Sequence, residues 1–103
     1  MIKIYEKNVG ENSSILIWKS KSEHITDLVE WALLEEYKEF GEYFKITENH
    51  IYQIIQELLE DYFNDVEPDL LEAVADLISM VRKMDNRKEY FIKITKTKGA
   101  KNG

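Results

Sequence analysis

Apolar residues between positions 47 and 81 recur at the spacing of an α-helix, in two successive stretches. The first stretch contains Ile51, Ile54, Ile55, Leu58, Leu59, Tyr62 and Phe63. The second contains Leu70, Leu71, Val74, Leu77, Ile78 and Val81. Steps of three and four residues place side chains on one face of a helix, so the pattern predicts amphipathic helices at about 48–63 and 68–84. We expect these helices to supply the core through Ile54, Leu58, Val74, Leu77 and Ile78.

A third helix is predicted N-terminal to these two, with apolar positions at Ile25, Leu28, Val29, Ala32, Leu33, Tyr37 and Phe40. Ser20, with Glu23 three residues later, fits a capping box at its start, and Gly41 is typical of a helix end. For the other two helices, Thr47 is suited to be a cap and Pro68 to lie in a first turn, where its missing N–H costs nothing.

Alternation of apolar and polar residues predicts strands at both ends of the chain. At the start, Ile2 and Ile4 alternate with Lys3 and Tyr5, and a second β-rich run (SILIWK) follows at positions 14–19. Gly and Asn between these two runs favour a hairpin connection. Near the end the alternation returns in Tyr90, Ile92 and Ile94.

Residues 42–47 (EYFKIT) fit either an extended connector or a short strand, and we treat their similarity to residues 89–95 (EYFIKIT) as chance. A lone hairpin is only marginally stable, so the C-terminal strand is expected to complete the sheet. The predicted fold is α+β, with three helices packed on one face of a small antiparallel sheet in the order β-β-α-α-α-β. We expect residues 1–97 to form one domain with its ends close together, and residues 98–103 a basic flexible tail.

Composition narrows the class of protein. A chain of 103 residues with 44% hydrophobic and 33% charged residues is typical of one soluble, folded domain. The sequence has no cysteine, which excludes disulfides, thiolate nucleophiles and zinc sites built on sulfur, and it fits a cytoplasmic location. No apolar run approaches the roughly 20 residues of a membrane span, so we expect no membrane association.

Charge is distributed unevenly along the chain. The net charge is −6, but residues 1–22 carry +2, residues 23–81 carry −14 and residues 82–103 carry +6. Residues 46–81 contain nine acids and no Lys or Arg. This asymmetry predicts an acidic face and a basic edge or tail, and such a distribution guides the choice of partner more than the fold.

Six of these acids are the candidate partner-binding residues. They are Glu57, Glu60 and Asp61 on the helix at 48–63, and Asp69, Glu72 and Asp76 on the helix at 68–84. With a rise of about 1.5 Å per residue, such carboxylates recur roughly every 4.5–6 Å along a helix, an imprecise imitation of phosphates spaced by about 3.4 Å along a DNA strand. The alternative is an ordinary solvated helix face, although such faces usually carry interspersed Lys.

Trp31 and Leu34 lie off the apolar stripe of the first helix. Large apolar groups that are exposed together often mark an interface, and Trp is frequent among binding hot spots. We therefore consider the pair an apolar anchor for a partner. The alternative is that another segment, such as residues 41–47, covers them.

The predicted sheet offers a competing binding surface. If its isoleucines face the helices, the other face presents Lys3, Tyr5, Lys7, Phe91 and Lys93, together with Trp18 if its strand is in matching register. Aromatic rings flanked by Lys are typical of surfaces that bind single-stranded nucleic acid, although the net negative charge opposes it and no ribonucleoprotein motif is present. A homodimer or a second layer that buries the rings is the alternative.

No catalytic motif is present. His24 and His50 lie near expected helix starts without the spacing of a metal-binding pair, and the acids lie on polar helix faces without the contrasting environments of an acid–base pair. The sequence therefore predicts a protein that is not an enzyme and holds no metal or cofactor.

In size, acidity and lack of a catalytic signature, the chain resembles the small inhibitors that phages and mobile elements direct against host nucleic-acid machinery, including anti-CRISPR and anti-restriction proteins. The resemblance implies an acidic, nucleic-acid-mimicking helical surface that binds a basic, nucleic-acid-binding partner protein. We expect that function, with a single-stranded nucleic-acid-binding module as the alternative.

Overall fold

The computed structural model describes residues 1–96 as four strands and four helices. In chain order they are β1 (Ile2–Asn8), β2 (Ile15–Ser20), α1 (Glu23–Ala32), α2 (Leu34–Phe40), β3 (Tyr43–Ile46), α3 (Glu48–Asn64), α4 (Pro68–Lys83) and β4 (Lys88–Ile94). The α+β class is confirmed. The predicted order lacks one helix and one strand, because the helix near the N-terminus is divided and residues 42–47 contain β3.

The sheet has the strand order β2-β1-β4-β3, and every pair is antiparallel. The central strands β1 and β4 come from opposite ends of the chain, with Ile4 opposite Ile92. The N-terminal ammonium donates a hydrogen bond of 2.6 Å to the carbonyl of Thr95, so the two ends of this region are close together, as expected. The predicted tail at residues 98–103 lies outside the described residues.

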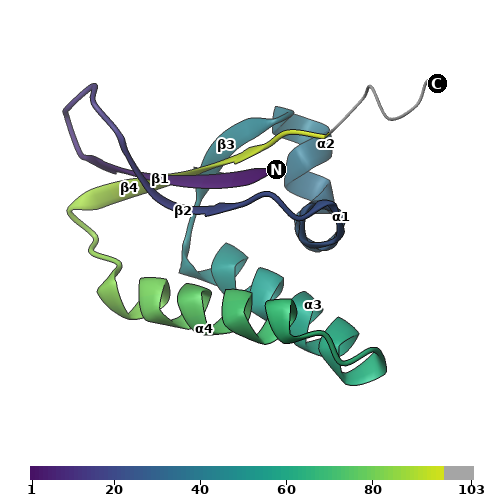
Figure 1. Cartoon of the computed structure of the whole chain (residues 1–103). Helices are drawn as coiled ribbons and strands as arrows, with labels where there is room; N and C mark the ends of the chain where they lie inside the picture. Colours follow the sequence, from purple (N-terminus) through teal and green to yellow (C-terminus); the bar gives the residue numbers. More distant parts are fainter. Residues whose placement is uncertain (97–103) are drawn as a thin grey trace.

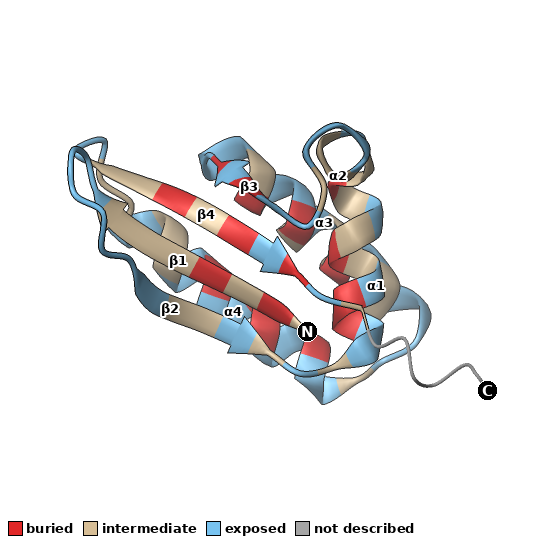
Figure 2. Ribbon diagram, turned by 90° about the horizontal axis from the view of Figure 1, so that it is seen from above, coloured by how far each residue is buried: buried red, intermediate tan, exposed pale blue. Residues whose placement is uncertain are grey.

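One face of the sheet is covered and the other is open. Helices α3 and α4 lie side by side beneath the strands, and α1 packs at the end of this layer (Figure 1). Seen from above, none of the described helices lies over the strands β1, β2 and β4 (Figure 2). The period-two alternation of β1 and β4 follows from this arrangement, since Ile2, Ile4, Ile92 and Ile94 are fully buried while Lys3 and Lys93 point away from the helices.

The helix ends follow local chemistry. The backbone N–H of Thr47 donates to Nδ1 of His50, and Pro68 occupies the first turn of α4, as the sequence predicts. The predicted capping box at Ser20 is wrong, because Ser20 ends β2 and the hydroxyl of Ser22 caps α1 by accepting from the N–H of Ile25. Gly41 ends α2 as predicted.

The single helix predicted before Gly41 is broken at Leu33. This residue leaves helical geometry, with φ −112° and ψ 32°, and its side chain is fully buried. The break turns α2 towards β3, against which it packs. Burial of Leu33 in the common core therefore decides the direction of the chain at this point.

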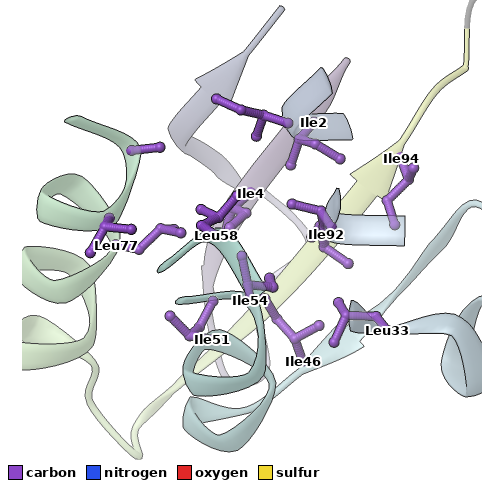
Figure 3. Close-up of a cluster of buried hydrophobic side chains, with 14 of the residues drawn as sticks. Ile2, Ile4, Leu33, Ile46, Ile51, Ile54, Leu58, Leu77, Ile92 and Ile94 are labelled. Carbon is purple, nitrogen blue, oxygen red and sulfur yellow. The ribbon is translucent and has the colours of Figure 1, made fainter. Parts of the chain in front are cut away.

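The core lies between the sheet and the helices. Figure 3 shows Ile54 and Leu58 of α3 and Leu77 of α4 gathered with the isoleucines of the sheet. Val74 is buried too, so four of the five predicted core positions are confirmed. Ile78 is 42% exposed, and its placement in the core is wrong. The reason is that Leu70, Ala73, Val74 and Leu77 fill the buried face of α4, which leaves Ile78 at its margin.

Candidate binding surfaces

Charge is divided between the two layers of the fold. The four helices contain thirteen acids and three basic residues, a net charge of −10. The four strands contain six lysines and two acids, a net charge of +4. The sequence predicts a basic edge or tail, whereas in the structure lysines are also concentrated on one face of the sheet. Two candidate surfaces follow, one on each layer.

The first surface is a groove between α4 and the edge strand β2, which we call the α4–β2 groove. It consists of two hollows of about 480 Å³ and 220 Å³ that share Asp76. The acids Asp69, Glu72 and Asp76 line it from α4. Its other lining residues include the large side chains Ile17, Trp18, Met80 and Tyr90 and, at its margins, the lysines Lys19 and Lys83.

Asp69, Glu72 and Asp76 are exposed, and no ion pair to any of them is found within residues 1–96. By contrast, Glu6 at the far end of the groove accepts hydrogen bonds of 3.2 Å from both Lys88 and Tyr90. The three acids of α4 are therefore the carboxylates of this groove that remain available to a cationic ligand.

The acids of α3 lie on a different side of the helical layer. Oδ2 of Asp61 lies 2.7 Å from Nε2 of His24 on α1, so this acid faces α1 and not the α4–β2 groove. Glu57, one turn earlier on the same face, has a pKa raised by partial burial and by Glu60 and Asp61. Glu60 is exposed and accepts from the side chain of Gln56 at 3.3 Å. The six predicted acids therefore form two groups and not one continuous face.

The hydrogen bond to Asp61 raises the pKa of His24 above its ordinary value of 6.5, with Glu67 and Asp27 adding to the effect and burial opposing it. The second histidine, His50, lies 3.2 Å from Glu36 of α2. The contact of His24 therefore connects α1 to α3, and the contact of His50 connects α2 to α3. No group of three or more His, Cys, Asp or Glu side chains in residues 1–96 is arranged to hold a metal ion.

Trp31 and Leu34 are separated by the break at Leu33. Trp31 is 64% exposed on α1, whereas Leu34 is half-buried at the first position of α2. Other large apolar side chains are exposed on α3, α4 and the turn between them, namely Tyr52, Phe63, Val66, Leu71 and Ile78. Trp31 remains a candidate anchor. The exposure of Phe63, Leu71 and Ile78 was not predicted, because all three continue the apolar stripes of the predicted helices.

The second surface is the open face of the sheet. The strand registers place Lys3, Tyr5 and Lys7 of β1 on it together with Lys93, Phe91 and Glu89 of β4. Lys19 and Leu16 of β2 and Tyr43 and Lys45 of β3 lie on the same side. We call these ten residues the open sheet face. It contains five lysines and one acid.

Three aromatic rings cluster on the open sheet face. Tyr43 stacks on Phe91 with ring centres 5.5 Å apart and planes 7° apart, and Tyr5 meets Tyr43 edge-on at 6.4 Å. The ammonium group of Lys7 lies 5.6 Å from the centre of the Phe91 ring. Tyr43 was missed by the sequence analysis because residues 42–47 were not assigned to the sheet.

Trp18 does not belong to the open sheet face. It pairs with Ile4, whose side chain is in the core, and it lines the α4–β2 groove. The expectation that Trp18 joins the aromatic face is therefore wrong. The register between β1 and β2 shifts next to Ile4, and such an irregularity cannot be read from the alternation of a six-residue strand.

No protein-family model, curated protein or solved structure matches this chain. The residues themselves therefore carry all that can be inferred about function. Within residues 1–96, none of the helices combines the length and the apolar character that crossing a membrane requires.

Proposed function

We propose that the protein is a non-enzymatic inhibitor or regulator that uses the α4–β2 groove to bind a basic segment of a partner protein. The observation that carries this proposal is the row of Asp69, Glu72 and Asp76, which form no ion pair within residues 1–96, along a groove that also has apolar lining. Carboxylates on one wall provide charge-assisted hydrogen bonds to Lys or Arg, and Ile17, Trp18 and Met80 accommodate their aliphatic stems.

The shape of the groove supports an extended segment as the bound element. Its second wall is β2, which is an edge strand of the described sheet and pairs there with β1 alone. Edge strands present free backbone groups, so a segment in the groove can also form backbone hydrogen bonds. The three acids lie at i, i+3 and i+7 along α4, so they are spaced to meet successive basic side chains of such a segment.

The partner that we propose is a basic, nucleic-acid-binding protein, as expected of the phage and mobile-element inhibitors that the composition resembles. Surfaces that bind nucleic acid are rich in Lys and Arg. An acidic row that occupies them competes with phosphates for the same cations, and the net −10 of the helical layer accelerates association at low salt. The other candidate residues lie on other sides of the helical layer and add electrostatic steering or a second contact with the partner. They are Glu57, Glu60, Asp61 and Trp31.

The experiment begins with affinity capture from a lysate of the organism that encodes the chain, followed by kinetic binding measurements on the purified partner. We expect the triple variant D69K/E72K/D76K to slow association at least tenfold. The control E35K/E39K/E42K changes the net charge equally at exposed acids of α2 and the following turn. Equal effects of the two variants would show that only the overall charge matters, and would contradict the groove.

A second variant tests the groove without changing the charge. Ser79 is exposed and lines the larger hollow, so Ser79→Trp fills it from the surface of α4. We expect weaker binding with unchanged stability to urea. Addition of the nucleic acid that the partner binds tests the mimicry, because displacement of the partner is expected if the acids occupy its phosphate-binding residues.

A further inference from the structure

The open sheet face has an arrangement of charge that folding alone does not favour. Lys3 lies directly opposite Lys19 on one neighbouring strand and directly opposite Lys93 on the other. Adjacent strands are about 4.8 Å apart, so three lysines stand side by side across β2, β1 and β4. Like charges in directly opposite positions destabilise a sheet.

No acid relieves this repulsion within the described residues. The only acid of the open sheet face, Glu89, is bound by Lys45 at 3.0 Å and by Lys7 at 3.5 Å. Among residues 1–96, no ion pair is found for Lys3, Lys19 or Lys93. The face keeps a net charge of +4 although the whole chain carries −6.

From this row of lysines beside the rings of Tyr5, Tyr43 and Phe91, we propose that the open sheet face binds single-stranded nucleic acid. Phosphates lie along Lys19, Lys3 and Lys93, and bases stack on the neighbouring aromatic side chains. Phe91 already contacts Tyr43 and Lys7, so Tyr43, which is 49% exposed, offers the main free ring surface. Lys19, at the edge of this face, also lines the α4–β2 groove, but the lysine row and the rings do not depend on the function proposed for the groove.

Three physical arguments select this ligand over others. A second copy of the same face would bring +4 against +4, which opposes a homodimer through this surface. Bases of a duplex are already stacked on each other, whereas those of a single strand can stack on protein rings. The acids of the helices are separated from the lysines by the core layer, and at 0.1 M salt the screening length of about 10 Å weakens their repulsion of phosphates.

The test is a fluorescence anisotropy titration of a labelled 12-nucleotide single strand, as DNA and as RNA, with the full chain. We expect saturable binding whose affinity falls about twentyfold between 50 and 200 mM salt, as three released counterions predict for a single strand. K3Q/K19Q/K93Q should lower the slope of log affinity against log salt by about 2. Tyr43→Ala should weaken binding by at least about fivefold, since stacking contributes about 1–3 kcal/mol per base.

A matched control separates the site from the overall charge. K38Q/R82Q/K83Q removes three exposed basic residues that lie on helices α2 and α4, and it should leave the affinity within about twofold of the unmodified chain because none of the three belongs to the open sheet face. Urea unfolding of every variant verifies the fold. Failure of the unmodified chain to bind at 50 mM salt would overturn the proposal, as would equal losses for the control.

Two further probes distinguish other occupants. A duplex of the same sequence should bind more weakly than the single strand, and heparin binding should be insensitive to Tyr43→Ala because heparin has no bases. Equal affinity for duplex and single strand, or an unchanged affinity of Tyr43→Ala for the single strand, would overturn base stacking. Self-association that K3Q/K19Q/K93Q abolishes, without oligonucleotide binding, would instead identify the acidic groove of a second copy as the occupant and overturn the proposal.

Discussion

His24 of α1 and Asp61 of α3 are joined by a contact of 2.7 Å between Nε2 and Oδ2, although they are 37 residues apart in the sequence. This contact fixes the N-terminus of α1 against the end of the acidic helix. It also engages Oδ2 of Asp61, so this carboxylate is less available to a partner than the exposed acids of α4. The exposed acids on α4 differ from Asp61 in this respect, because no ion pair within residues 1–96 engages them.

The pair predicts a pH-dependent contribution to stability. Because the pKa of folded His24 is raised, the contribution is fully present below pH 6.5 and is lost as the pH rises through the folded value. Both side chains are partly exposed, so we expect His24→Gln to lower the free energy of unfolding by about 0.2–1 kcal/mol at pH 5.5 and by less at pH 8.5. Urea melts at both values measure this. A deficit that is constant or grows with pH would contradict the assignment to His24.

The core predicts a sharp contrast between neighbouring residues of α4. Leu77 is fully buried, so Leu77→Ala should lower the free energy of unfolding by about 2–5 kcal/mol, as should Leu58→Ala. Ile78→Ala is the matched control, since its side chain is 42% exposed, and it should cost about 1 kcal/mol or less. Urea melts with unchanged slopes test the series. Equal losses at positions 77 and 78 would show that α4 is rotated.

The sequence predicted the structure best where the apolar pattern continues over several helical turns. Helices α3 and α4 span 17 and 16 residues, so several turns of the pattern agree and the caps at Thr47 and Pro68 agree with them. By contrast β3 has four residues, too few for alternation to distinguish a strand from a connector. The two similar segments that we treated as a chance match form β3 and β4, which pair directly.

The candidate sites were harder to predict than the helices. Residue types and charge pointed to Asp69, Glu72 and Asp76, but the groove depends on β2, which is about 50 residues earlier in the chain. The open sheet face was partly predicted because Lys3, Tyr5, Phe91 and Lys93 follow from alternation alone. Its row of three lysines required the register between β1 and β2, which no local pattern provides.

The backbone conformation of Gly41 predicts that a substitution there lowers stability. Its φ of 83° and ψ of −149° lie in a region that is essentially restricted to glycine, and no other residue approaches within 4 Å of the position of an added Cβ. Gly41→Ala should therefore lower the free energy of unfolding by about 1–3 kcal/mol through backbone strain alone. Glu39→Ala, at an exposed position of α2, is the control and should change it little. A neutral Gly41→Ala in urea melts would show that the turn adopts another geometry.

The lysine row predicts that single substitutions stabilise the protein. Lys3 faces Lys19 and Lys93 directly, so Lys3→Gln should raise the free energy of unfolding by about 0.2–1 kcal/mol at 0.1 M salt. Lys93→Gln should give a smaller gain, because Lys93 faces only one of the other two lysines. Both gains should fade at 1 M salt, where the screening length falls to about 3 Å.

Lys45→Gln is the control for this series, because Lys45 loses an ion pair of 3.0 Å with Glu89 and should gain nothing. Thermal and urea unfolding of the three variants at both salt concentrations measure the differences. A residue that lowers stability while it supports binding is the expected signature of a functional site, since binding there must offset the cost in the free protein. If Lys3→Gln and Lys45→Gln change stability equally, the lysines opposite one another do not repel, and the row is ordinary solvated surface.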